Sequence, residues 1–254
     1  MSLIAIEHLD KTYRTHAGAE VIALDDINLE VGEGEFVTVV GPSGCGKTTL
    51  LKILGGLLPL SSGSVRLNGT PVDEPRRDIA VVFQTPVLLP WRTVLENVML
   101  PMEIQGRPRD EARARELIDL VGLGGFEDKY PFELSGGMQQ RNSIVRALMI
   151  DPAILLMDEP FGALDAMVRE QMNVELQRIW LETGKTVVFI THSIQEAVFL
   201  GDRVVVLTPR PGRIAQVFPV DLPRPRDLDV MADPEFGRLV GQVRACFDLK
   251  GGLD

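Results

Sequence analysis

The chain has 254 residues, and its 45% apolar and 24% charged residues are typical of a folded globular protein and exclude a disordered one. Acidic residues outnumber basic residues by 36 to 26, and the formal charge of −10 argues against nucleic acid as a partner, because it repels a polyphosphate backbone. A local loop of amide groups with one lysine can still attract the phosphates of a nucleotide, so the net negative charge does not exclude a nucleotide ligand.

The cysteine content and the N-terminal segment indicate the compartment. Cys45 and Cys246 are the only cysteines, too few and too far apart for a disulfide framework, which favours a reducing environment. Residues 1–13 lack the basic start and long apolar stretch of a signal peptide, and no run reaches the roughly 18 apolar residues that a membrane span needs. We therefore expect a cytoplasmic chain that does not cross a bilayer.

Short apolar runs rich in β-branched residues predict buried strands. In chain order they cover residues 36–40, 79–83, 153–157, 187–190 and 204–207. Helical stretches lie between them, and this alternation predicts an α/β fold with a largely parallel sheet and helices on both of its faces. Chains of this length often form one unit around a single sheet, and we expect one main domain over residues 1–225.

Two helices are predicted from apolar residues repeated at helical spacing. The first covers residues 110–121 and has its apolar stripe at Ala114, Leu117, Ile118 and Val121. The second has its stripe at Val168, Met172, Leu176 and Ile179 and ends at Gly184. Both stripes are expected to face the core.

Two further segments do not fit the regular alternation of strands and helices. Residues 87–150 have a mainly helical pattern and predict a helical subdomain inserted between core strands. The Pro- and Arg-rich segment 222–229 is followed by a short helical pattern, and we expect residues 226–254 to form a short C-terminal appendage.

The segment GPSGCGKTT at residues 41–49 is the strongest functional motif. It satisfies G-x-x-x-x-G-K-[ST], follows the predicted strand 36–40 and precedes an apolar helical pattern. Its glycines let the backbone wrap closely, so that amide groups and the positive end of the next helix face an anion. The expected nucleotide-binding residues are Gly41, Pro42, Ser43, Gly44, Cys45, Gly46, Lys47, Thr48 and Thr49.

Individual side chains of this loop have predicted roles. Lys47 would hold the β- and γ-phosphates of a nucleoside triphosphate, the Thr48 hydroxyl would coordinate Mg²⁺, and Thr49 would assist. Cys45 is expected to matter as a small side chain, whose thiol could be labelled and would then block binding.

The segment LSGGMQQR at residues 134–141 predicts a second anion site. Ser135 is a natural helix N-cap, and Gly136 and Gly137 expose the amides of the first turn. A chain that binds one nucleotide needs only one anion site for the γ-phosphate, unless the fold brings both sites to the same phosphate. We therefore expect this helix to serve a nucleotide held by a second subunit.

The segment AILLMDEP at residues 153–160 is a predicted buried strand that ends in two adjacent carboxylates. Asp158 would hold Mg²⁺ through a bound water, and Glu159 would orient and polarise the attacking water. The alternative is an ordinary solvated strand end, which the presence of the phosphate loop disfavours.

These motifs, in this order and over nearly the whole chain, resemble the ATPase subunits of ATP-binding cassette (ABC) transporters. The resemblance implies a P-loop NTPase (RecA-like) core with a mainly parallel sheet, an N-terminal antiparallel β subdomain and an inserted helical subdomain. It also implies ATP and Mg²⁺ as cofactors. In a head-to-tail dimer, Ser135, Gly136 and Gly137 of one copy would contact the γ-phosphate of ATP held by the other.

Four further positions match the family pattern, and each has an ordinary structural alternative. Tyr13 falls where the family stacks an aromatic ring on adenine, but it could also be a plain strand tyrosine. Gln84 matches a glutamine that reaches Mg²⁺ and the catalytic water, or it is a polar strand cap. Asp165 matches an aspartate that touches the opposite subunit and would also cap a helix. His192 matches the switch histidine that contacts the γ-phosphate and positions the water, the alternative being a structural histidine.

Other stretches resemble the importers of nitrate, sulfonates and taurine within this family, namely PVLLPWRTVLENV, HSIQEAVFLGDRVVVLTPRPGRI and DLPRPRD. The resemblance implies an ATPase on the inner face of the cell membrane that powers import. Its partners would be a second copy of the chain, transmembrane permease subunits and, indirectly, a solute-binding protein.

Two local features bear on this expectation. The apolar segment around Trp91 is expected to receive a short permease helix, unless Val87, Leu88, Leu89 and Trp91 pack inside. Asn142 and Ser143 are polar where the family usually has small apolar residues, which puts the packing of that helix in question.

Two other functions are disfavoured. A soluble ABC ATPase acting on nucleic acid or ribosomes would use the same dimer, but the acidic charge argues against it. Residues 49–133 between the two phosphate motifs also contain no coiled-coil insertion. A small-molecule P-loop kinase would have no use for LSGGMQQR.

Overall fold

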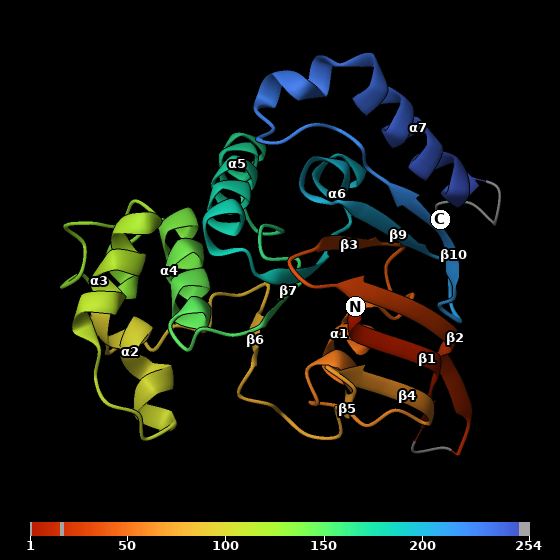
Figure 1. Ribbon diagram of the computed structural model, residues 1–254, viewed down its shortest axis with the longest axis horizontal. Coiled ribbons are helices and arrows are strands. Elements are labelled where there is room, and N and C mark those ends of the chain that lie inside the picture. The colour runs from red at the N-terminus through yellow and green to blue at the C-terminus, as the bar shows by residue number, and fades with distance from the viewer. Residues whose placement is uncertain (1, 16–17, 249–254) are drawn as a thin grey trace. The chain divides into compact units, whose positions relative to one another are not determined.

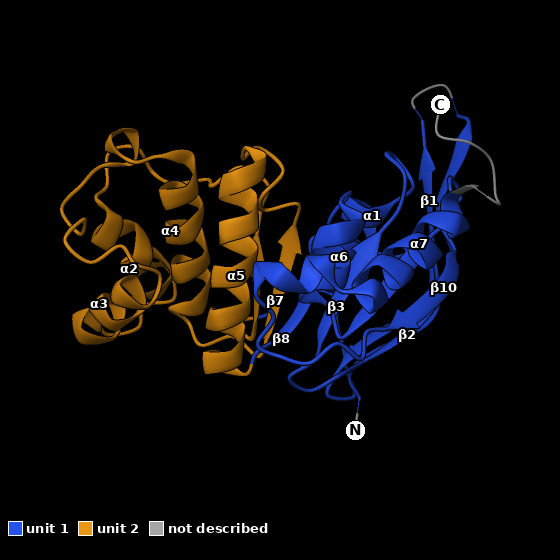
Figure 2. Cartoon of the chain, turned by 90° about the horizontal axis from the view of Figure 1, so that it is seen from above, with its two compact units in different colours: residues 1–76, 185–254 blue, residues 77–184 orange. Residues whose placement is uncertain are grey.

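The computed structural model describes residues 2–15 and 18–248 and separates them into two compact units (Figures 1 and 2). The first unit contains the residues up to 76 and those from 185 onward, and the second contains residues 77–184. The last six residues of the expected C-terminal appendage, 249–254, lie outside the described residues.

The first unit begins with an antiparallel sheet. Its strands follow the order β2-β1-β4-β5 and comprise β1 (Ser2–Arg14), β2 (Glu20–Gly32), β4 (Ser62–Leu67) and β5 (Thr70–Pro71). Apolar side chains of β1 and β2, among them Ile6, Leu9 and Ile27, are buried on this sheet. The N-terminal antiparallel β subdomain that the family resemblance implied is therefore present.

A second sheet of the first unit is built around β3 (Phe36–Val40). This strand pairs in parallel with β8 (Thr186–Ile190) and with β9 (Arg203–Leu207), and β10 (Ile214–Pro219) runs antiparallel along β9. All residues of β3 and β8 are buried, and the helices α1 (Lys47–Leu54) and α6 (Ile194–Leu200) pack against these strands. The predicted α/β fold is confirmed, with the strands at the predicted places.

The C-terminal segment packs into the first unit. The short helix η2 (Leu228–Ala232) leads to α7 (Pro234–Asp248), which lies against α6, β9 and β10 (Figure 1). Phe236, Leu239 and Val243 form the buried stripe of α7. Ahead of these helices, the Arg226 side chain is only 3% exposed and donates hydrogen bonds to backbone carbonyls at the end of α6.

The second unit combines a parallel strand pair with helices. The pair is formed by β6 (Ile79–Val82) and β7 (Ile154–Asp158), and the helices are α2 (Val94–Ile104), α3 (Glu111–Leu120), η1 (Pro131–Glu133), α4 (Gly136–Leu148) and α5 (Ala166–Thr183). Helices α2, α3 and α4 pack on one another and occupy the segment for which a helical subdomain was predicted.

The two predicted apolar stripes lie on α3 and α5. Ala114, Leu117 and Ile118 of α3 are buried, as are Met172, Leu176 and Ile179 of α5, whereas Val168 is half-buried. Helix α5 ends at Gly184, whose φ of 61° is the left-handed conformation that favours glycine.

Asn142 and Ser143, the two polar residues of α4 noted in the sequence, are both buried. The Ser143 hydroxyl donates to the carbonyl of Gln140 at 2.8 Å, which satisfies it. The Asn142 side chain is fully buried, and among the described residues neither of its amide atoms has a hydrogen-bonding partner. Packing at Asn142 is therefore less favourable than at a small apolar residue.

Within residues 2–15 and 18–248, no helix has both the length and the apolar character to cross a membrane.

Candidate nucleotide-binding site

The phosphate loop at residues 41–49 joins β3 to α1, as the sequence predicts. Gly46 is the N-cap of α1 and has a φ of 109°, and no side chain caps the first-turn amides of this helix. A Cβ atom on Gly46 would lie 2.7 Å from Leu24 Cδ2 and 2.9 Å from the carbonyl oxygen of Ala23, so both conformation and space require glycine. The helix therefore presents uncapped amide groups and its positive dipole end, which suit an anion.

Lys47 and Cys45 lie inside this loop. The Lys47 ammonium group donates to the carbonyl of Gly41 at 2.8 Å and to that of Pro42 at 3.1 Å, so its charge is held within the loop. Cys45 is buried, and burial raises the pKa of its thiol. A buried, protonated thiol reacts slowly, so the labelling considered from the sequence is disfavoured in the folded chain.

Tyr13 is brought to the end of the phosphate loop. Its hydroxyl lies 3.2 Å from Thr49 Oγ1, and the Lys11 ammonium lies 5.2 Å from the centre of its ring. The ring is part of the exposed surface of β1. The ring thus lies at the surface beside the phosphate loop, and its contact with adenine remains a prediction.

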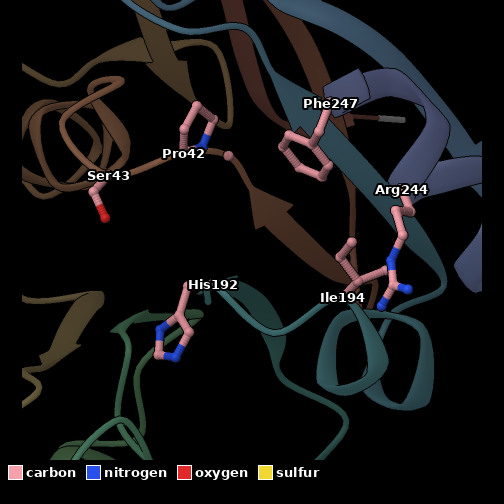
Figure 3. A pocket seen from close by; sticks show the side chains of 7 residues that line it. Pro42, Ser43, His192, Ile194, Arg244 and Phe247 are labelled. Carbon is pink, nitrogen blue, oxygen red and sulfur yellow. The ribbon is translucent and has the colours of Figure 1, made fainter. Parts of the chain in front are cut away.

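His192 follows β8 and shares a cavity with the start of the phosphate loop (Figure 3). The cavity has a volume of about 440 Å³ and is lined by residues 41–43 and His192, and by Ile194, Arg244 and Phe247 on its other side. Ser193 caps α6 by accepting from the Glu196 amide at 3.3 Å, which fixes the backbone next to His192. The structure thus brings two predicted parts of the site, the phosphate loop and the histidine, to one cavity.

Asp158 and Glu159 stand at the carboxyl end of β7 in the second unit. Both side chains are half-buried. Glu159 has a φ of 46°, a left-handed conformation that is unusual for a residue other than glycine. Its carbonyl accepts the Gly162 amide at 3.0 Å, which closes a turn directly after the strand. Strained backbone of this kind is concentrated at functional sites, because the surrounding structure must hold it.

Gln84 lies beside this turn. It follows β6, which pairs in parallel with β7, so the carboxyl ends of the two strands meet at one edge. A Cβ atom on Gly162 would lie 3.0 Å from Gln84 Nε2, which places the glutamine amide against the turn after Glu159. The structure therefore groups Gln84, Asp158 and Glu159 within the second unit.

The LSGGMQQR segment forms the start of α4. Ser135 is its N-cap and accepts the Met138 amide at 3.3 Å, and Gly136 and Gly137 make the first turn. Gln140 Nε2 donates to the Phe83 carbonyl at 3.4 Å, which links this helix to the residue before Gln84. The predicted N-cap role of Ser135 is present, while its contact with a second copy is a prediction.

Asp165 is the N-cap of α5. Its carboxylate accepts the Val168 amide at 3.0 Å, as the local sequence predicts. A Cβ atom on Gly137 would lie 3.2 Å from Val168 Cγ1, so the first turns of α4 and α5 are close together. The structure thus joins the LSGG segment and Asp165 in one part of the second unit.

The sequence interpretation missed Arg244 and Phe247, which line the cavity beside His192. Phe247 lies four residues after the buried Val243, so the apolar stripe of α7 could have indicated it. Arg244 has no such signal, because only the packing of α7 places it there. The described residues contain no group of three or more His, Cys, Asp or Glu side chains that could hold a metal ion alone.

Comparisons with known proteins place this site in a family. Residues 24–162 match the ABC transporter family. The taurine import ATP-binding protein TauB of Rhizobium johnstonii is 47% identical over 250 residues, which is 96% of this chain and 95% of that protein. The nitrate import ATP-binding protein NrtC of Synechococcus elongatus is 47% identical over 239 residues, 92% of this chain and 36% of that protein.

A solved structure of an ATP-binding cassette is also similar to this chain. It is a dimeric ATP-binding cassette in a post-hydrolysis state, bound to ADP and Pi. It has a TM-score of 0.75 and 35% sequence identity, covering 86% of this chain and 99% of that one. The chain described here therefore belongs to the ABC transporter family.

Proposed function

We propose that the chain is the ATP-binding and hydrolysing subunit of an importer for small solutes such as nitrate, sulfonates or taurine. The observation that carries the proposal is the phosphate loop, where the uncapped start of α1 and the Lys47 ammonium group offer amides and a cation to a polyphosphate. Relatives named as taurine and nitrate import ATP-binding proteins support the importer assignment, since they match over more than nine tenths of the chain.

The proposed chemistry assigns a role to each polar group. Gln84 and Asp158 offer the oxygen atoms that Mg²⁺ prefers, and Thr48 would add the phosphate-loop hydroxyl. Mg²⁺, when bound with ATP, would neutralise charge on the β- and γ-phosphates. Glu159 would polarise the attacking water from its strained backbone position, and His192 would contact the γ-phosphate.

A second copy of the chain would complete each site. In the proposed head-to-tail dimer, Ser135, Gly136 and Gly137 of one copy face the ATP held by the other, and Asp165 contacts the opposite copy. The dimeric cassette bound to ADP and Pi supports the formation of a dimer, because that protein shares the fold at 35% identity. Closure around ATP would exclude water and position the nucleophile, which is how such a site accelerates phosphoryl transfer.

The permease partner would dock on exposed apolar residues of the second unit. Trp91 is 70% exposed and Val87 is 56% exposed, so these two residues do not pack inside. Asn97 is fully buried and holds the segment that presents Trp91, accepting the Leu89 amide at 2.8 Å and donating to the Arg92 carbonyl at 3.0 Å. An exposed apolar patch held this rigidly suits a short helix of another protein on the inner face of the membrane.

The permease proposal is tested with Trp91→Ala. We expect this variant to keep its ATPase activity in isolation but to lose copurification with membranes. Ile104→Ala, which also removes an exposed apolar side chain, serves as the control. Equal copurification of both variants with membranes would contradict the docking surface.

The ATPase proposal is tested with two substitutions. Lys47→Ala should lose ATP affinity, because the loop loses its cation. Glu159→Gln should keep ATP affinity, stop hydrolysis and accumulate an ATP-bound dimer in size-exclusion chromatography with Mg-ATP. Glu170→Gln, which changes an exposed carboxylate of α5, is the control and should behave like the wild type. An active, monomeric Glu159→Gln variant would overturn the assignment of this residue.

A further inference from the structure

The loop at residues 208–213, which connects β9 to β10, is a rigid element of the first unit. We call it the TPRPGR loop after its sequence. Thr208 closes it, because its hydroxyl accepts the Arg213 amide at 3.0 Å and donates to the Pro211 carbonyl at 2.9 Å. Two backbone hydrogen bonds tie the loop to β2, from Gly212 to Ala23 at 2.9 Å and from Asp25 to Gly212 at 3.0 Å. The loop therefore has a fixed position.

This loop contacts the phosphate loop at two points, the carbonyl groups of Gly44 and Cys45. Arg210 donates from both Nε and Nη2 to the carbonyl oxygen of Gly44, each at 3.2 Å. Gly212 lies so close to the carbonyl of Cys45 that a Cβ atom on Gly212 would be 2.1 Å from the oxygen. Two consecutive carbonyl groups of the phosphate loop are therefore directed at the TPRPGR loop.

The direction of these carbonyls decides the direction of the amides that follow them. A trans peptide unit is planar, and its C=O and N–H groups point to opposite sides. When the Gly44 carbonyl faces Arg210, the Cys45 amide faces away, and it donates to the Pro42 carbonyl at 3.3 Å within the turn. Because the Cys45 carbonyl lies against Gly212, the Gly46 amide of the same peptide unit points away from the TPRPGR loop, and in the proposed site it would donate to a phosphate.

We propose that Arg210 and Gly212 are positioning residues, which hold the phosphate loop in the form that binds ATP. Neither would touch the nucleotide. Arg210 would act by binding the Gly44 carbonyl, and Gly212 by leaving room for the Cys45 carbonyl to point outward. Gly44 has a φ of 74°, in the region that favours glycine, and a glycine backbone has other conformations open to it, so the Arg210 donor would help to hold this orientation. If the phosphate loop already has this conformation before ATP binds, less conformational entropy is lost on binding.

The inference rests on the proposed binding of ATP by this loop, and Arg210→Ala tests it. The matched control is Arg213→Ala, which removes an exposed arginine of the same loop whose guanidinium group pairs with Asp25 instead of Gly44. We expect Arg210→Ala to raise the Kd for ATP about fivefold to tenfold, the effect of losing a charge-assisted interaction of two donors with one carbonyl at a partly solvated site. Arg213→Ala should keep the wild-type Kd.

Two further measurements separate positioning from a general loss of structure. The thermal unfolding midpoint of the chain without nucleotide should fall no further in Arg210→Ala than in Arg213→Ala. Arg210→Lys should recover part of the affinity, because an ammonium group supplies one donor but not the paired geometry of a guanidinium. In steady-state ATPase assays, Arg210→Ala should raise KM by more than it lowers kcat.

The possible results have distinct meanings. A wild-type Kd in Arg210→Ala, or an equal loss of affinity in Arg213→Ala, would overturn the positioning role while leaving ATP binding intact. If the unsubstituted chain binds no ATP and Lys47→Ala makes no difference, the proposed function fails, and this inference fails with it.

Discussion

Replacing Arg226 with methionine should loosen the C-terminal helix α7 and destabilise the first unit. The guanidinium group donates to five backbone carbonyls, those of Val198 at 3.0 Å, Phe199 at 2.8 Å, Gly201 at 2.9 Å, Val220 at 3.3 Å and Leu222 at 3.1 Å. Burial lowers the pKa of Arg226 to about 10, with Arg224 acting in the same direction, so the group is charged at neutral pH.

The size of the expected loss in stability follows from the carbonyl groups that Arg226→Met leaves without a donor. Methionine keeps much of the arginine's volume, so the cavity is small and the main loss is the five orphaned carbonyls. Losing the hydrogen bonds of a buried guanidinium group and leaving their carbonyl acceptors without it costs about 3–5 kcal/mol in total. For a chain of this size, that cost lowers the thermal unfolding midpoint by roughly 6–20 °C.

The assay is differential scanning fluorimetry combined with hydrogen exchange of the peptide that contains α7. Arg238→Met is the control, because Arg238 is an exposed residue of α7 that pairs with Glu235 on its own helix. We expect the control to keep the wild-type midpoint, since surface ion pairs contribute little. An Arg226→Met variant with the midpoint and α7 exchange rate of the control would refute the reasoning.

Three further predictions concern the buried side chains of Asn142 and Cys45. Asn142→Val should raise the free energy of unfolding by about 1–2 kcal/mol, because it removes a buried amide without a partner among the described residues; a lower urea midpoint in this variant would contradict that account. Cys45 should react with maleimide more slowly than the half-buried Cys246, as mass spectrometry of the labelled peptides can measure. Because burial raises the pKa of Cys45, the unfolded state loses its thiol proton first. The stability that this thiol contributes should therefore be complete below about pH 8.5 and decrease above it, a decrease that Cys45→Ala should lack.

Much of the fold could be predicted from local sequence. The runs at residues 36–40 and 187–190 are apolar throughout because both faces of β3 and β8 are covered, which leaves an unmistakable pattern. The stripe on α3 and the end of α5 at Gly184 were predictable for a similar reason, since helical spacing and the left-handed conformation of glycine are local properties.

The sequence by itself determined the phosphate loop, because strand, glycines, lysine and helix follow one another within about a dozen residues. It also determined the N-cap roles of Ser135 and Asp165, which bond amides three residues ahead. The tertiary structure alone decided which distant residues support the loop. Arg210 reaches Gly44 across 166 positions of sequence, and no local pattern records that contact.

The tertiary structure also placed Arg244 in the cavity beside His192, by docking α7 against α6. The physical reason is the same in both cases. Conformational preferences and helix caps depend on residues that lie close together in the sequence, so they can be recognised from a short segment. Contacts between distant segments depend on how strands pair and helices pack, and these become fixed only when the whole unit has folded.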